Sequence, residues 1–299
     1  MSMNWSTFRT RSLTALVFVA VMLIGLLWNE WTFFILFSLI HAGCWVEYHQ
    51  LHRRILPGYA SLHILFTTGL LITGWSLCML CYRHAIEHSY FFAAGIIIGG
   101  VGLLSVFTGI ILSLKAGAKS ILRALLGFIY LSVSFALLLH IRSAAMWLPS
   151  SEETSFGIGH AVARMSGYFV PLLLIGSIWI NDTMAYIVGS FIGKTPLSHI
   201  SPKKTWEGTI GGIILAVCIA YFVGRLWFGG DAPVQFMIVA GIAAISGTLG
   251  DLLESKLKRM AGVKDSGTIM PGHGGFLDRF DSLLLATPFV WVYLWAEAF

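Results

Sequence analysis

Long apolar runs separated by short polar connections make up most of this chain. Nine windows of predominantly apolar residues follow one another, most of them near the length of about 20 residues that a helix needs to cross a bilayer. We therefore expect an all-α polytopic integral membrane protein with about nine transmembrane helices. The first two windows are short and are joined only by Asn29 and Glu30, so either a tight hairpin or incomplete insertion fits them. The windows are residues 13–28, 31–47, 61–81, 90–114, 120–141, 167–192, 209–228, 233–250 and 283–299.

Composition leads to the same class of protein. Hydrophobic residues make up 57% of the 299 residues and charged residues 11%, and the mean hydropathy is +0.81. A soluble globule of this size needs more polar surface than that. Lipid must therefore solvate much of the chain.

The basic residues predict an orientation. If the N-terminus is cytoplasmic, 15 of the 19 Lys and Arg residues lie in cytoplasmic segments, which is the bias of the positive-inside rule. This favours an N-in, C-out topology. The bases are dispersed over short loops, so the pI near 9.1 does not indicate a nucleic-acid partner. Anionic membrane lipids and nucleotide phosphates are the expected partners.

One polar interval divides the chain. Residues 142–166 form the longest polar stretch outside the motifs and are expected to be an external connecting loop. They separate residues 1–141, with about five spans, from residues 167–299, with about four spans and the candidate chemistry. Both charged motif segments then face the cytoplasm.

Residues 250–283 concentrate charge, with ten of the chain's 33 charged residues. Asp251 and Glu254 are three residues apart, as are Asp278 and Asp281, so each pair shares a face of a helix. Such acids beside bases suit Mg²⁺ and a polyphosphate. We expect Asp251, Asp278 and Asp281 to be catalytic and to bind metal. Glu254 either lines the polar cavity or pairs with Lys258.

A glycine-rich turn follows in the same segment. Gly274 and Gly275 allow the backbone to approach a ligand and to donate N–H groups to phosphate. His273 is placed with the catalytic residues, although binding phosphate, protonating a leaving oxygen and bracing the loop are all open to it. Further phosphate-binding candidates are the bases Arg259, Lys264 and Arg279.

A second segment, residues 181–212, also carries candidates. Asp182 lies inside an apolar window, where a carboxylate is costly unless it faces a polar cavity or a partner. Structural pairing with a neighbouring helix is the alternative. Just before the window at residues 209–228, the side chains offer ammonium and hydroxyl groups, which suit phosphate binding. The positive-inside rule explains the basic residues equally well. These candidates are Ser201, Lys203, Lys204 and Thr205.

Two strings carry a family resemblance. Residues 193–208 read G-K-x-x-L-x-x-x-S-P-K-K-T-x-E-G. Residues 255–281 read S-x-L-K-R, four residues, K-D-S-G, and then P-G-H-G-G-F-L-D-R-F-D. Both strings closely resemble the signatures of the phosphatidate cytidylyltransferase (CDP-diacylglycerol synthase) family. The resemblance covers roughly residues 180–283, whereas the first 140 residues match only as generic membrane helices.

The resemblance implies an activity and its partners. CMP would pass from CTP to phosphatidate, giving CDP-diacylglycerol and pyrophosphate, with Mg²⁺ as cofactor, at the cytoplasmic face of a bacterial inner membrane. A second metal ion and a homodimer are left open. One alternative is CMP transfer to a different lipid phosphate. An ion-coupled membrane transporter that uses Asp182 is the alternative from another class.

Overall fold

The fold consists of helices and short connections. The computed structural model describes residues 5–86, 88–143, 167–227, 232–268 and 274–298. Over these ranges the only β-pairing is an isolated bridge between Pro196 and Thr205, so the expected all-α class is confirmed. The chain forms two compact units, Met1–Ala136 with Leu257–Phe280, and Leu137–Lys256 with Asp281–Phe299. The sequence-based division at residues 142–166 stays a prediction, because residues 144–166 lie outside the described ranges.

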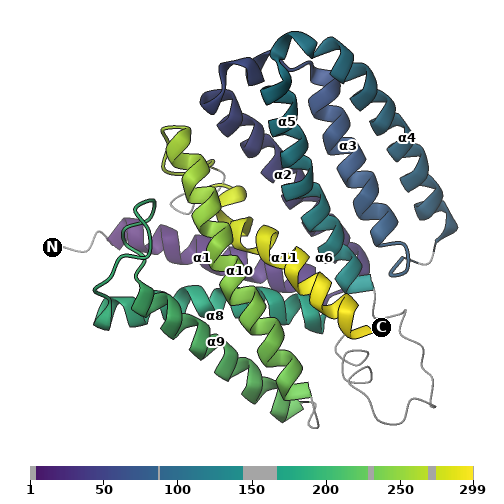
Figure 1. Cartoon of the computed structure of the whole chain (residues 1–299). Coiled ribbons are helices and arrows are strands. Elements are labelled where there is room, and N and C mark those ends of the chain that lie inside the picture. The colour runs from purple at the N-terminus through teal and green to yellow at the C-terminus, as the bar shows by residue number, and fades with distance from the viewer. Residues whose placement is uncertain (1–4, 87, 144–166, 228–231, 269–273, 299) are drawn as a thin grey trace. The chain divides into compact units, whose positions relative to one another are not determined.

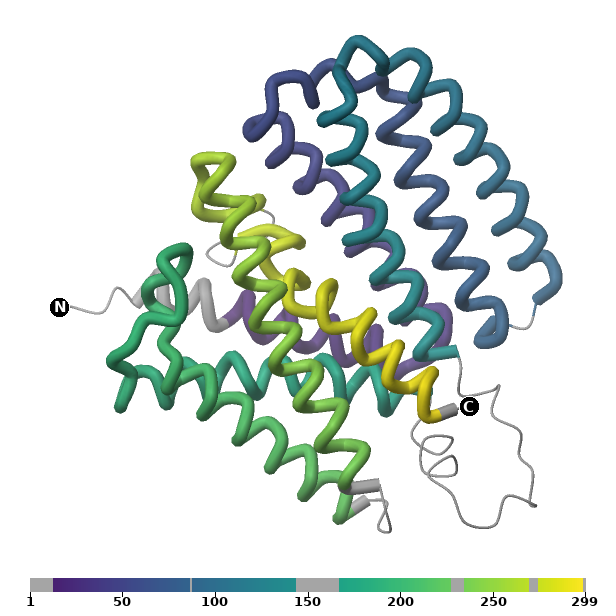
Figure 2. The backbone as a smooth tube through the Cα atoms, in the orientation of Figure 1, coloured from purple at the N-terminus to yellow at the C-terminus, as the bar shows by residue number. Residues whose placement is uncertain are grey.

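The first unit is a bundle in which α2, α3, α4 and α5 lie side by side (Figure 1). Short 3₁₀ turns join some of the helices, and a π-helical turn continues α5 directly into α6, whose last residues belong to the second unit (Figure 2). The elements are α1 (Trp5–Leu27), α2 (Glu30–Ile55), η1 (Pro57–Ser61), α3 (Ile64–Cys81), α4 (Ser89–Leu112), η2 (Leu114–Ala116), α5 (Ala118–Gly127), η3 (Phe128–Val133) and α6 (Ser134–Ser143).

The second unit carries the first motif string, whereas residues 257–280 of the second string belong to the first unit. In the second unit, α8 (Phe169–Ile192) packs against α9 (Trp206–Trp227). The helices α10 (Ala232–Met260) and α11 (Leu277–Ala298) each have one end in the first unit. Glycines permit the close α8–α9 approach, because a Cβ at Gly208 would lie 2.6 Å from the carbonyl oxygen of Ala185.

Helices occupy all nine of the expected windows. Within the described ranges, seven helical segments are long and apolar enough to cross a membrane by length and composition; α11 is not among them, and the apolar part of α1, Leu13–Leu27, is shorter. The span count and the orientation therefore stay predictions. The second helix is longer than its apolar window. Although its apolar window ends at residue 47, α2 continues to Ile55, because hydropathy marks apolar length and not the helical turns beyond it.

Polar side chains of α2 tie this helix to the α5–η3 segment. The Trp45 indole N–H donates to Ser132 Oγ at 3.0 Å, and the Tyr48 hydroxyl donates to the Arg123 carbonyl at 2.8 Å. His41 Nε2 lies 2.9 Å from the same Ser132 oxygen. Hydrogen bonds between buried groups hold helices in one register, because a displaced partner would leave a polar group unsatisfied. These hydrogen bonds of His41, Trp45 and Tyr48 therefore hold in place the turns of α2 that carry Glu47.

Glycine also sets the approach of α3 to α4. A Cβ at Gly109 would overlap the backbone nitrogen and Cα of Phe66, and one at Gly102 would lie 2.8 Å from the backbone nitrogen of Thr73. Small residues let two membrane helices pack backbone to backbone, where dispersion contacts are dense. Replacing them requires the helices to separate.

We predict that Gly109→Val destabilises the purified protein. The new side chain meets backbone, which cannot move aside as a flexible side chain can, and overpacking of this kind costs about 1–3 kcal/mol. Gly100→Val on the same helix is the matched control, because a Cβ there has nothing within 4 Å. Thermal unfolding in detergent should show a lower midpoint for Gly109→Val than for Gly100→Val. Equal midpoints would contradict the packing described here.

Candidate functional site

Three carboxylates meet in the second unit. Asp251 and Glu254 lie on α10 and Asp281 lies on α11, and one carboxylate oxygen from each falls within 4.8 Å of the others. Asp281 is 7% exposed and Glu254 is 0% exposed. Because Glu254 is buried, it does not form a solvent-exposed pair with Lys258 on the surface of α10. The Lys204 ammonium makes an ion pair with Asp251. We call Lys204, Asp251, Glu254 and Asp281 the Lys204 cluster.

Lys204 keeps its positive charge in this setting. Burial lowers the pKa of its ammonium, but the carboxylate of Asp251 and then those of Asp182 and Asp281 more than offset burial, so the pKa lies above its ordinary value. Asp182, on α8, therefore acts on the same lysine, although its own side chain is exposed. Lys204 therefore remains an ammonium at neutral pH, paired with Asp251.

The connection before α9 holds Lys204 in place. Thr205 caps α9, since its hydroxyl oxygen accepts the N–H of Gly208 at 3.2 Å. The carboxylate of Glu207 accepts the backbone N–H groups of Lys194 and Thr195 at 3.2 Å. Thr205 and Glu207, two members of the first motif string, thus shape the loop itself. The Lys203 side chain is exposed.

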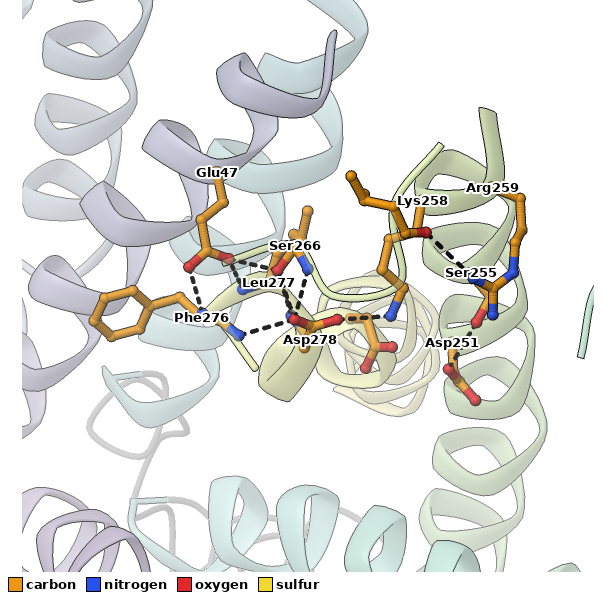
Figure 3. A network of polar contacts seen from close by, with 12 residues as sticks. Glu47, Asp251, Ser255, Lys258, Arg259, Ser266, Phe276, Leu277 and Asp278 are labelled. Atoms are coloured by element: carbon orange, nitrogen blue, oxygen red, sulfur yellow. Dashed lines mark hydrogen bonds and ion pairs between the residues drawn. The ribbon is translucent and has the colours of Figure 1, made fainter. Parts of the chain in front are cut away.

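A second group of carboxylates lies in the first unit, around Glu47 of α2 (Figure 3). Glu47 accepts the backbone N–H groups of Phe276 and Leu277, both at 2.8 Å, and the Ser266 hydroxyl lies 2.6 Å from its Oε2. Asp278 accepts the N–H groups of Ser266 and Gly275 at 2.8 Å. We call Glu47, Ser266, Phe276, Leu277 and Asp278 the Glu47 network.

The charge of Asp278 is compensated within this network. Its Oδ1 lies 2.6 Å from the Lys258 ammonium. Asp278 precedes the apolar run of α11. Burial alone would raise its pKa, but the Gly275 N–H and Lys258 outweigh burial and hold the pKa of Asp278 below its usual value.

A cavity of about 740 Å³ opens beside the Glu47 network. Residues of α2 and of the 263–268 segment line it, including the basic side chains of Arg54 and Lys264, both exposed. These two cations and the polar backbone nearby suit an anionic group better than a neutral one.

The structure places the remaining candidates as follows. The Arg259 guanidinium donates to the Val263 carbonyl at 3.2 Å, and Arg279 is exposed at the start of α11. Gly274 has a positive φ of 81°, which favours glycine. The N–H of Gly275 is taken by Asp278, and the Ser201 carbonyl accepts the N–H of Lys204 at 3.1 Å. His273 lies outside the described residues.

Sequence reasoning missed Glu47, Ser266 and Asn181. Asn181 is buried beside Asp182, and its amide donates to the Thr248 hydroxyl at 3.3 Å. Glu47 could have been found by the signal that marked Asp182, since it too is an acid at an apolar window. Ser266 gave no signal beyond its place in the second motif string.

Comparison with known proteins identifies the family. The family model that matches is that of the cytidylyltransferase family, and the match covers residues 9–296. The chain belongs to the cytidylyltransferase family. The resemblance seen in the two motif strings is therefore confirmed, and it extends into the N-terminal helices that had matched only generically. Membership favours nucleotidyl transfer over the transporter alternative.

Particular relatives carry a more specific name. The phosphatidate cytidylyltransferase of Staphylococcus haemolyticus is 38% identical over 186 residues, which are 58% of this chain and 69% of that protein. The phosphatidate cytidylyltransferase of Haemophilus influenzae is 42% identical over 128 residues, 41% of this chain and 44% of the relative. The phosphatidate cytidylyltransferase of Bacillus subtilis is 45% identical over 121 residues, which are 39% of this chain and 44% of that protein. The aligned part thus spans less than half of the last two.

We predict that Asp278 stabilises the fold only while it is ionised. Because its folded pKa is lowered, its contribution is present above the ordinary carboxyl pKa of 3.8 and is lost as the pH falls through the lower folded value. The unfolding midpoint of the wild type should exceed that of Asp278→Asn at about pH 6, and the difference should shrink below about pH 4. A difference that stays constant down to about pH 3 would show that the charge is not what stabilises.

Proposed function

We propose that this protein transfers CMP from CTP to phosphatidate, giving CDP-diacylglycerol and pyrophosphate. Membership of the cytidylyltransferase family and the names of three relatives support this activity. The observation that carries it in the structure is the Lys204 cluster, where three carboxylates and one ammonium converge. Acids and a base at one point suit the binding of a cation and a polyphosphate.

The reaction needs alignment more than it needs a strong base. A phosphate oxygen of phosphatidate attacks the α-phosphorus of CTP, and the bond from that phosphorus to the oxygen bridging the β-phosphorus breaks. Pyrophosphate leaves with the electron pair. The attacking monoester is already an anion at neutral pH, so its oxygen needs no strong base to become a nucleophile. Lys204 is placed to attract the polyanion, and Lys203 adds positive charge at the exposed face of the same loop.

The donor set of the Lys204 cluster fits Mg²⁺. Carboxylate oxygens are hard ligands of the kind that Mg²⁺ prefers. Two ionised carboxylates whose nearest oxygens lie within 4.8 Å repel by a few kcal/mol, on the order of 3 at an effective dielectric constant of about 20, and a bound dication offsets that repulsion. When bound, the ion would supply positive charge to the phosphates of CTP. We propose Asp251, Glu254 and Asp281 as its ligands. Asp278, expected from sequence in this set, is engaged by Lys258, Ser266 and Gly275.

The membrane setting follows from the same proposal. Apolar helices and bacterial relatives support a bacterial membrane protein. We place it in the inner membrane with the N-terminus inside and both motif segments facing the cytoplasm, where a soluble nucleotide meets a phosphate held by the bilayer. A further metal ion, another lipid phosphate as acceptor and a homodimer stay open to experiment.

We expect Asp281→Asn to lower kcat for CDP-diacylglycerol formation by at least about 100-fold, which is about 3 kcal/mol of transition-state stabilisation. The amide keeps the volume and an oxygen that can accept the Ser282 N–H, so the protein should stay folded. Glu297→Gln is the matched control, because it removes a carboxylate from the other end of the same helix, outside the Lys204 cluster. Similar kcat values for the two variants at saturating Mg²⁺ would remove the cluster from the reaction.

Cysteine labelling tests the orientation. The four native cysteines are free thiols and are first replaced. Single cysteines are then introduced at Lys203, Thr268 and Arg83, which are all exposed. A membrane-impermeant reagent should label Lys203→Cys and Thr268→Cys only when it reaches the cytoplasmic face, and Arg83→Cys only from outside. Labelling of positions 203 and 268 from opposite faces would contradict the proposed topology.

A further inference from the structure

Glu47 brings a distant helix to the start of α11. Its partners lie 219 to 230 residues away in the sequence, and its side chain is only 5% exposed. Both carboxylate oxygens are used, since Oε1 accepts the Phe276 N–H and Oε2 accepts the Leu277 N–H. These N–H groups belong to the first residue of α11 and the residue before it, which have no carbonyl partner inside the helix. A carboxylate at this end also complements the helix dipole.

The surrounding backbone is shaped to this side chain. A Cβ at Gly275 would overlap the carboxylate of Glu47, and one at Gly267 would lie 2.7 Å from its Cδ. The two glycines therefore leave room that the Glu47 carboxylate occupies. On the other side, α2 is held by the hydrogen bonds of Trp45 and Tyr48. The part of α2 that carries Glu47 is thus also held by contacts outside the loop.

Ser266 couples Glu47 to Asp278. Its Oγ lies 2.6 Å from Glu47 Oε2 and 2.9 Å from Asp278 Oδ2 (Figure 3). A hydroxyl has one proton, so it can donate to only one of the two carboxylates at a time. The N–H of Asp278 also donates back to this oxygen at 3.3 Å. The first turn of α11 is therefore fixed by Glu47 directly and through Ser266.

This arrangement determines where the helix begins and how it is rotated. Asp278 and Asp281 are three residues apart on α11, so the rotation of its first turn sets the direction of both side chains. Asp281 is one of the three carboxylates of the Lys204 cluster. We propose that Glu47 is a positioning residue for CMP transfer, which holds the first turn of α11 so that its acids keep the orientation that the reaction needs. The inference rests on the proposed function, and it assigns Glu47 no contact with the substrate.

Glu47→Gln tests the proposal with little change in volume. The amide has one oxygen in place of two, and its NH₂ group would face a backbone N–H. We expect kcat to fall by about 10- to 100-fold, since a misplacement near 1 Å can cost that much, with little change in the KM for CTP. Hydrogen–deuterium exchange should quicken in the peptide covering residues 274–282 and stay unchanged in the rest of α11.

Two controls separate positioning from general destabilisation. Glu30→Gln makes the same chemical change on the same helix, away from the Glu47 network, and should retain the wild-type kcat. Gly109→Val lowers stability through the α3–α4 contact, and should leave the exchange of residues 274–282 relative to the other α11 peptides unchanged. If Glu47→Gln does not fold, Ser266→Ala decides the matter, because it removes only the shared hydroxyl and should give the same local exchange and a smaller loss of kcat.

The outcomes are distinct. A wild type that makes no CDP-lipid from CTP and phosphatidate would contradict the proposed function and not the contacts of Glu47. An active wild type with an equally active Glu47→Gln variant would overturn the positioning role. So would a loss of activity in Glu47→Gln, or in Ser266→Ala where that variant decides, without faster exchange at residues 274–282.

Discussion

The cost of holding carboxylates among apolar helices governs the arrangement of this protein. Removing an ionised carboxylate from water costs several kcal/mol unless partners replace the lost hydration. Three acids at or near the helix ends have such partners. Glu47 takes two backbone N–H groups, Asp278 takes Lys258 with two further N–H groups, and Asp251 takes Lys204. Most of these partners lie in the loops, so the charges help to determine how the loops fold.

Compensation of this kind also makes the polar segments rigid. Glu207 and Thr205 hold the connection before α9, and Ser266 with Asp278 holds the connection before α11. Glycine allows the close approach on which both depend, as at Gly208 and Gly275. A site built from such segments needs little reorganisation when a polyanion arrives, which is how preorganised charge assists group transfer.

The sequence predicted the helices well because membrane-spanning helices depend on apolar length, which can be read locally. It also brought Asp251 and Glu254 to one face of α10, because a spacing of three is a property of the helix itself. The end of α2 was missed, since the helix outlasts its apolar window. The role of Glu47 was missed for a different reason. Its partners lie more than 200 residues away, and no local pattern encodes such a contact.

The expectation for Asp278 shows the same limit. Its spacing from Asp281 predicted a shared helical face, but it could not reveal that Lys258 and the Gly275 N–H would engage Asp278. Likewise, the glycine-rich turn indicated free backbone donors, whereas the N–H of Gly275 serves an internal carboxylate. Motif strings identify which residues matter, and the chain's own charges decide which of them remain available to a ligand.

The central claim is that the protein joins CMP to a lipid phosphate at an acidic, cation-dependent site. The most direct measurement incubates the purified wild type with CTP labelled at the α-phosphate and with phosphatidate in mixed micelles, and follows labelled lipid and pyrophosphate together. The account predicts equal amounts of the two products, none when diacylglycerol replaces phosphatidate, and none when divalent cations are chelated. Pyrophosphate release without a labelled lipid, or transfer that persists under chelation, would contradict it.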